Sequence, residues 1–133
     1  MTGGTYDIIA EEGSTLSLQF EYQDENSSPV NITSSSNIIE FTVKRTSTKT
    51  DTFMFKVRSD GNDVEGAFEF PDTENIFGRI TKTGGTVGSF LLTLKAETMD
   101  LFKIETYFYN LRLLNDATVT PLCKGRLIVE SKV

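Results

Sequence analysis

A hydrophobic side chain at every second position, in two stretches that a short connector joins, constrains the fold of this chain most. The alternating residues are Phe90, Leu92 and Leu94 in the first stretch and Tyr107, Tyr109, Leu111 and Leu113 in the second. A period of two is typical of strands, because successive side chains on a strand point to opposite faces. Residues 95–103 between them are good helix formers, but the run is too short for an isolated helix. The sequence therefore predicts two strands and one short helical turn near residues 96–101 that pack as one unit.

Shorter stretches with the same period follow one another along the rest of the chain. They cover residues 6–10, 15–22, 30–33, 39–45, 53–57 and 119–129, with weaker examples at 65–70 and 76–80. Polar turns separate them at intervals of about eight to twelve residues, and no long amphipathic helix interrupts them. This pattern predicts an all-β fold, an Ig-like antiparallel β-sandwich of about seven to nine strands.

The size and composition of the chain fit one domain with a core of its own. It has 133 residues, of which 38% are hydrophobic, including ten Phe and four Tyr. A chain of this length buries about two-thirds of its unfolded surface on folding. The single cysteine, Cys123, excludes an internal disulfide, and its place in a predicted strand favours a small buried hydrophobe over a nucleophile. We expect one β-sandwich domain spanning residues 1–133.

The charge of the chain limits its partners. The formal net charge is −6, the pI is near 4.6, and the 13 Lys and Arg residues are scattered along the sequence. Phosphate binding needs cations gathered on one face, so we expect no nucleic acid partner. No apolar run is long enough to span a bilayer, and residues 1–4 do not begin a secretory signal. These features predict a protein that is cytosolic when made and has no membrane partner.

The sequence offers little for catalysis or metal binding. Histidine is absent, which removes Ser-His-Asp, Cys-His and histidine–metal chemistry. Three pairs of acidic residues stand close together in the sequence, namely Glu11 with Glu12, Asp24 with Glu25, and Glu97 with Asp100. Strand neighbours point to opposite faces and turn residues stay hydrated, so solvated surface explains these pairs better than catalysis. Residues 60–65 and 83–88 share some features of a calcium loop and a phosphate loop, but hairpin turns explain both. We predict no catalytic residue, no cofactor and no metal site.

Four hydrophobic residues fall on the outer faces of the predicted strands. They are Phe108, Leu91, Ile38 and Met54. Scattered exposed apolar residues are normal, whereas a group of them on one surface marks a face that something covers. The sequence leaves both interpretations open with equal weight.

The order of the motifs resembles a small β-sandwich module of tailed-bacteriophage virion proteins, the tail fibre and baseplate Ig-like domain family. Residues 6–18 resemble its opening, an acidic break with glycine before an alternating strand, and residues 24–33 are similar to its polar turn, Asp-x-x-Gly-x-Pro-hydrophobic-Asp-Leu-Thr. Residues 92–98 and 106–113 resemble its strand, one-turn connector and Tyr-x-Tyr-Asp-Leu strand, and residues 125–129 its last strand.

This resemblance implies a non-enzymatic structural component of a tailed-phage virion, in the tail, neck, baseplate or fibre attachment. The partners would be other virion proteins, bound through protein–protein contacts in many copies of a symmetric assembly. The protein would be located in the virion after synthesis in the host cytoplasm.

The segments expected to make these contacts are residues 1–5, 46–52 and 60–65, with residues 131–133 as a tail. Two alternatives stay open. One is a capsid decoration protein that stabilises the head, and the other is a carbohydrate-binding module that attaches to a host glycan. The absence of Trp counts against the second, because sugar sites on β-sandwiches use aromatic platforms.

Overall fold

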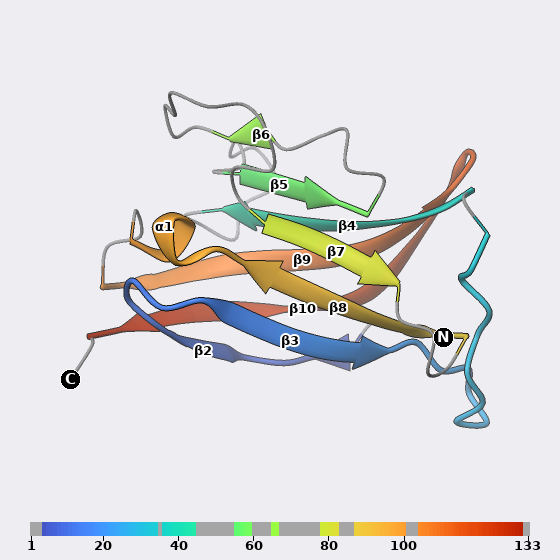
Figure 1. The fold of residues 1–133 in the computed structure, drawn as a ribbon. Coiled ribbons are helices and arrows are strands. Elements are labelled where there is room, and N and C mark those ends of the chain that lie inside the picture. Colours follow the sequence, from blue (N-terminus) through green and yellow to red (C-terminus); the bar gives the residue numbers. More distant parts are fainter. Residues whose placement is uncertain are drawn as a thin grey trace.

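Two β-sheets face each other in the computed structural model and enclose the hydrophobic core (Figure 1). The structure describes residues 4–34, 36–44, 55–59, 65–66, 78–82, 87–100 and 104–131. Within these ranges the chain forms ten strands and one short helix. The sequence patterns at 45–54, 60–64 and 67–77 lie outside the described residues.

The larger sheet is built around two long antiparallel strands near the carboxyl end of the chain. Across the sheet the order is β1 (Gly4–Thr5), β10 (Thr118–Glu130), β9 (Thr106–Asn115), β4 (Asn37–Lys44), β5 (Phe55–Arg58) and β6 (Glu65–Gly66). A further strand, β2 (Ile8–Glu11), lies beside β10 on the same side as β1. Both β1 and β2 run parallel to β10, whereas the other pairs in this sheet are antiparallel. The amino-terminal strands therefore form one edge of the large sheet.

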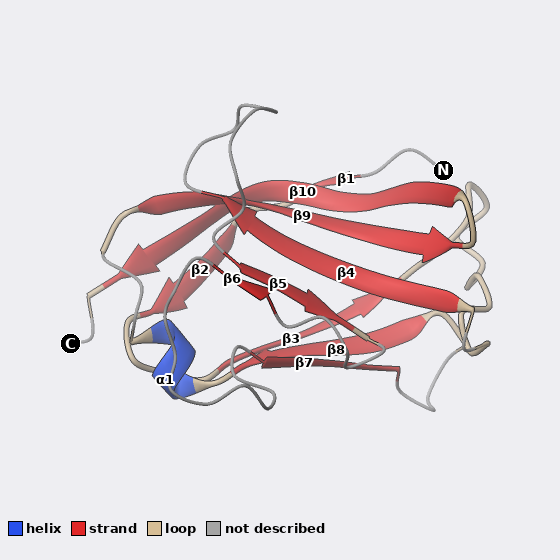
Figure 2. Cartoon of the chain, turned by 90° about the horizontal axis from the view of Figure 1, so that it is seen from above, coloured by secondary structure: helices blue, strands red, loops and turns tan. Residues whose placement is uncertain are grey.

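The smaller sheet consists of three described strands with an unbroken antiparallel register. In order they are β3 (Leu16–Glu21), β8 (Ser89–Leu94) and β7 (Gly78–Lys82). Leu18, Leu92 and Ile80 lie side by side in one row across the three strands. Figure 2, seen from above, shows this sheet as one layer and β4, β9 and β10 as the other.

Alternating side chains from both sheets fill the space between the layers, as the sequence pattern predicts. The largest fully buried side chains of the strands are Tyr107, Phe41, Phe90, Ile8, Ile39, Leu92, Leu94 and Leu111, and Ile32 and Met99 join them from segments between strands. Phe41 and Tyr109 come from adjacent strands, and their rings lie 5.6 Å apart. Burial of this continuous apolar surface is the main driving force for the fold.

A single helical turn follows β8, where the sequence predicts one. The helix α1 (Ala96–Met99) is held by Met99, whose side chain is fully buried in the core, and by the Met99 N–H bond to the Lys95 carbonyl at 3.0 Å. A helix this short is not stable in isolation, so docking must hold it. The prediction of a short turn near residues 96–101 is confirmed.

The strand predicted at 30–33 was wrong, because this segment is irregular backbone. The Val30 N–H donates to the Tyr22 carbonyl at 2.9 Å, and the Ile32 N–H donates to the Val87 carbonyl at 3.0 Å. Ile32 is fully buried. Apolar Val30 and Ile32 gave the segment a strand-like pattern, but Ile32 serves to anchor the connection from β3 to β4 in the core.

The strand order defines an Ig-like β-sandwich, which confirms the predicted fold class. The sheet β2-β10-β9-β4-β5-β6 facing β3-β8-β7 matches the variable-type arrangement, in which two added strands extend one sheet. Antibody domains of this kind carry a disulfide between the sheets that packs against a buried Trp. This chain has one Cys and no Trp, so aromatic and aliphatic packing takes the place of that cross-link.

Candidate functional site

The outer face of the large sheet, the surface turned away from the core, gathers residues from strands far apart in sequence. Alternation and register place the following residues on it: Ile9 and Glu11 of β2, Ile38, Glu40, Thr42 and Lys44 of β4, Lys56 and Arg58 of β5, Phe108, Asn110, Arg112 and Leu114 of β9, and Val119, Pro121, Lys124, Arg126, Ile128 and Glu130 of β10. We call this surface the outer face. It is the upper side of the molecule in Figure 2.

A buried carboxylate lies near the middle of the outer face. Glu40 is 2% exposed, and its side chain accepts a hydrogen bond from the Arg112 guanidinium across the β4–β9 pair. The Lys56 Nζ lies 3.9 Å from the other carboxylate oxygen. A buried carboxylate is tolerated when it is paired and hydrogen-bonded, and these two cations provide that pairing at a site with little water.

A second ion pair ties the amino-terminal segment to β10. The Asp7 carboxylate accepts hydrogen bonds from the Arg126 backbone N–H at 3.1 Å and from the Arg126 guanidinium at 2.6 and 3.2 Å. The side-chain hydrogen bond from Arg126, followed by the backbone one, lowers the pKa of the Asp7 carboxyl below its ordinary value. Asp7 lies between β1 and β2, so the pair fixes the point where the segment passes from one strand to the next.

The charge balance of the outer face is the reverse of that of the whole chain. Among the residues that the structure describes there, the cations are Lys44, Lys56, Arg58, Arg112, Lys124 and Arg126, and the acids are Glu40 near the centre, Asp7 beside Arg126, and Glu11 and Glu130 at one end. The chain as a whole has 19 acidic and 13 basic residues. Basic residues that are scattered in sequence thus form a band across strands β5, β4, β9 and β10. Sequence reasoning missed this band, because periodicity does not say which strands become neighbours.

Hydrophobic residues flank the charged band at both ends of the outer face. At one end Ile9, which is 63% exposed, pairs with Ile128; at the other Val119, which is 51% exposed, pairs with Leu114, and Leu114 pairs with Ile38. Of the four apolar residues predicted to face outward, Phe108 and Ile38 lie on this face of the large sheet. Leu91 lies on the outer face of the small sheet, and Met54 is outside the described residues.

A polar contact lies beneath the edge formed by β1 and β10. The Tyr109 hydroxyl donates to the Tyr6 carbonyl and lies 3.2 Å from the Cys123 Sγ. Burial is the main cause that raises the pKa of the Tyr109 phenol, with a smaller contribution from Cys123. Cys123 is half-buried and packs against the core, in keeping with the packing role expected for it.

Two of the acidic pairs considered for catalysis lie apart at the surface, and the side chain of Glu97, from the third pair, is outside the described part of the structure. Glu11 is exposed at the end of β2, and Asp24 and Glu25 lie in an exposed turn where Asp24 Oδ1 accepts the Asn26 and Ser28 N–H groups. Residues 60–64 and 83–86 lie outside the described residues. Among the residues that the structure describes, no three His, Cys, Asp or Glu side chains are grouped as a metal site would require.

The predicted contact segments lie mostly outside the described part of the chain. Residues 4–5 form β1, residue 65 begins β6, and residue 131 follows β10. None of the helices within the described ranges has the length and hydrophobicity needed to cross a membrane.

Comparison with known proteins supports the Ig-like fold, but it does not assign the chain to a family. No family model matches the chain, and no curated protein matches it in sequence. Two solved structures of a marsupial T cell receptor match 96% of the chain with TM-scores of 0.53 and 0.52, at 14% and 12% identity. The chain spans about half the length of those receptor chains, 50% and 49%. A match to the extracellular domain of the voltage-gated sodium channel beta4 subunit covers 100% of this chain and 97% of the beta4 chain, at 21% identity and a TM-score of 0.42.

The predicted membership in a phage virion family was wrong, and so was the virion location drawn from it. No family model supports it, and the solved structures reported above with TM-scores over 0.5 are T cell receptors. The motifs behind the resemblance are turn chemistry and alternation that any β-sandwich uses. In the turn at residues 24–33, for example, Asp24 accepts N–H groups of its own turn, and Asn31 Oδ1 accepts the Thr33 N–H at 2.9 Å.

Proposed function

We propose that this chain is a non-enzymatic module that binds partner proteins through the outer face of its large sheet. The observation that supports the proposal is the exposure of Ile9 and Val119 at opposite ends of a face that also carries a basic band. Exposed apolar patches beside ordered polar groups are typical of protein-binding surfaces.

The dimensions of the outer face favour a protein over a small molecule. Its two apolar ends lie at opposite ends of the long strand β10, on Ile128 and Val119, with charged residues between them. A ligand that covers both ends must extend along most of this strand, at about 3.3 Å per residue. A protein surface of standard size can do so and can match the charges as well.

The ion pairs of the outer face prepare it for binding. Arg112 and Lys56 are held by Glu40, and Arg126 is held by Asp7, so these side chains are ordered before a partner arrives. Ordering them beforehand reduces the conformational entropy lost on association. The excess of cations favours a partner with acidic residues at its centre.

The proposal can be tested with three variants of closely similar chemistry. Val119→Glu and Ile9→Glu each place a carboxylate at one apolar end of the outer face. Val87→Glu is the matched control, because Val87 is 44% exposed in the turn before β8 of the other sheet. Quantitative affinity enrichment from the cells that make this protein would compare the partners retained by each variant with those of the unmodified chain.

We expect Val87→Glu to retain the partners and the two outer-face variants to lose them, by roughly tenfold in affinity for the partner when purified. Loss of the same partners with Val87→Glu, or their full retention with Val119→Glu and Ile9→Glu, would contradict the proposal. Thermal unfolding of all three variants would verify that each is folded.

The glycan-binding alternative stays a prediction from sequence. Saturable binding of the isolated domain in a glycan screen would support it.

A further inference from the structure

The small sheet ends in two edge strands, and their sequences protect the two edges differently. β7 carries Arg79 and Lys82, and the Lys82 Nζ donates to the Ser34 carbonyl at 2.7 Å. Residues 16–20 of β3 contain no charge, no proline and no bulge, and within the described part of the chain β3 pairs with β8 alone. Charged residues, prolines and bulges are the features that usually protect an edge strand, because an unprotected edge allows another strand to pair with it.

Half of the backbone groups of β3 point away from the sheet. One step beyond the β3–β8 register, the Tyr22 N–H donates to the Gly88 carbonyl at 2.9 Å. Hydrogen-bonded and non-hydrogen-bonded pairs alternate in an antiparallel ladder. It follows that Ser17, Gln19 and Glu21 direct their N–H and C=O groups away from β8. A strand placed beside β3 would therefore find donors and acceptors in the spacing of a regular ladder.

The inward side chains of β3 are incompletely covered. Leu16, Leu18 and Phe20 are half-buried, whereas their cross-strand partners on β8 are fully buried. Phe20 already stacks on Phe90, with ring centroids 5.3 Å apart. An added strand with hydrophobic residues at alternate positions would cover the exposed part of this row, so side-chain burial would add to the backbone hydrogen bonds.

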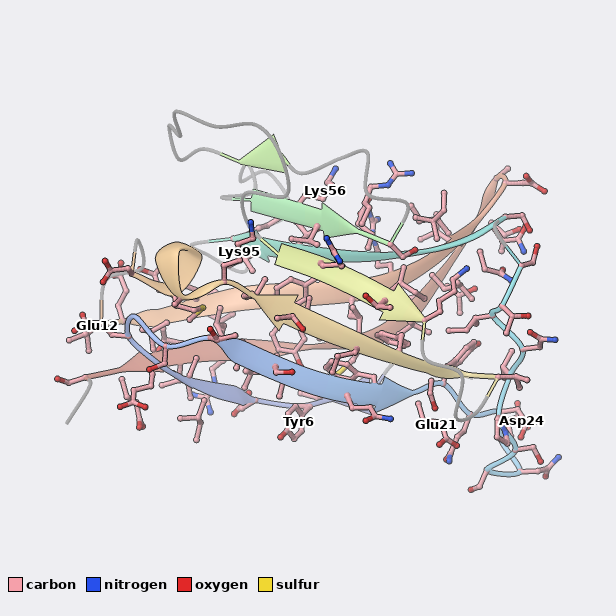
Figure 3. All side chains as sticks on the ribbon, viewed as in Figure 1. Tyr6, Glu12, Glu21, Asp24, Lys56 and Lys95 are labelled. Carbon is pink, nitrogen blue, oxygen red and sulfur yellow. The ribbon has the colours of Figure 1, made fainter. Side chains whose placement is uncertain are left out.

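Acidic residues stand at both ends of β3 and decide which kind of strand fits. Glu12 precedes the strand, while Glu21, Asp24 and Glu25 end and follow it. Figure 3 shows Glu12 beyond one end of β3 and Glu21 and Asp24 at the other. A second copy of this chain, paired antiparallel through the same edge, would bring acidic ends together and be repelled. A segment with basic residues at its ends would be attracted.

We propose that the free edge of β3 binds an extended segment of a partner protein, with alternating hydrophobic residues in its middle and Lys or Arg at its ends. The segment adds a fourth strand to the small sheet. Backbone pairing supplies affinity, and the apolar row and acidic ends supply selectivity. This inference rests on the proposed function only in treating the chain as a protein-binding module, because the edge belongs to the other sheet.

A peptide probe tests the edge directly. In the probe, valine alternates with threonine and a pair of lysines stands at each end; a control peptide has glutamates in place of the lysines. The full chain is titrated with each peptide, and amide NMR shifts and hydrogen exchange are recorded. We expect saturable binding of the lysine peptide, with slower exchange of the Ser17, Gln19 and Glu21 N–H groups, and at least roughly tenfold weaker binding of the glutamate peptide.

Two variants in one cross-strand row provide the matched control. Gln19 and Thr81 are both exposed, and they lie on either side of Leu91 in the register of the small sheet. Gln19→Lys adds a cation to the proposed edge and should weaken the binding of the lysine peptide by roughly fivefold. Thr81→Lys adds the same charge to the far strand and should leave the affinity unchanged.

Several results would overturn this inference. They are the absence of binding, new protection on β7 in place of β3, equal binding of the two peptides, and equal effects of Gln19→Lys and Thr81→Lys. Self-association of the chain that protects the β3 amides would assign the edge to a second copy instead. None of these outcomes bears on the Val119→Glu and Ile9→Glu experiment, so failure of the edge and failure of the outer face can be told apart.

Discussion

Arg112 and Arg126 make the same kind of ion pair in two different environments. Arg112 pairs with the buried carboxylate of Glu40, whereas Arg126 pairs with Asp7 at the exposed edge of the sheet. We predict that Arg112→Met lowers the free energy of unfolding by about 2 to 4 kcal/mol, because it removes the cation that donates a hydrogen bond to the buried Glu40 carboxylate. Arg126→Met should have a much smaller effect, since water screens its pair.

Urea denaturation of the two variants and the unmodified chain would measure both changes. High salt should leave the cost of Arg112→Met nearly unchanged, because salt screens exposed charges far more than buried ones. Equal losses of unfolding free energy in the two variants would contradict the structure, in which Glu40 is a buried charge stabilised by Arg112.

At the scale of single residues, the sequence was informative about the core and silent about the outer face. Alternation correctly assigned Tyr107, Tyr109, Leu111 and Leu113 to the interior. It could not distinguish Glu40 from a solvated strand carboxylate, because the residues that pair with it come from β5 and β9. Long-range strand order decides that burial, and a local period contains no information about it.

At the scale of elements, the amino-terminal strands depend on one close approach. The first part of the chain runs along β10, and the Tyr6 N–H donates to the Lys124 carbonyl at 2.9 Å. A side chain on Gly125 would place its Cβ 2.1 Å from the Tyr6 carbonyl oxygen, a backbone atom that cannot move without displacing the strand. Glycine at this position allows the segment between β1 and β2 to lie against β10.

We predict that Gly125→Ala displaces β1 and β2 from β10 and destabilises the fold by roughly 1 to 3 kcal/mol. Hydrogen exchange at residues 4–11 should become much faster, with residues 106–115 nearly unaffected. The control is Lys124→Ala, a change at the exposed neighbouring position. Unchanged exchange at residues 4–11 in Gly125→Ala would mean that the close contact is not required.

The strand pattern at 6–10 predicted an element but not its partner or direction. The parallel pairing of β1 and β2 with β10 joins strands from the two ends of the described chain. No hairpin turn connects these strands, so the sequence contains no local signal that predicts the pairing. Pro121 is another case, because it lies within a long strand yet causes no break. It stands at the register shift before Cys123, on the part of β10 that lies beyond β1 and β2, where proline costs no hydrogen bond to them.

For the molecule as a whole, the fold class could be predicted and the family could not. Short alternating strands with regular turns define a two-layer sandwich from physical requirements alone, and the chain folds as one. The turn residues at 24–33 suggested a virion protein, although any sandwich can satisfy its turns in this way. The Cys and Trp that mark antibody-type domains are missing, so sequence offered no direct link to the receptor domains that share the fold.

The account depends most on the outer face of the large sheet as the surface that binds protein. Methyl cross-saturation NMR on the complex with a captured partner would test it most directly. We predict strong saturation transfer to the methyl groups of Ile9, Ile128 and Val119 and none to Val87, which lies before β8 of the small sheet. Transfer to Val87 and Leu91, with none to Ile9 and Val119, would contradict the account.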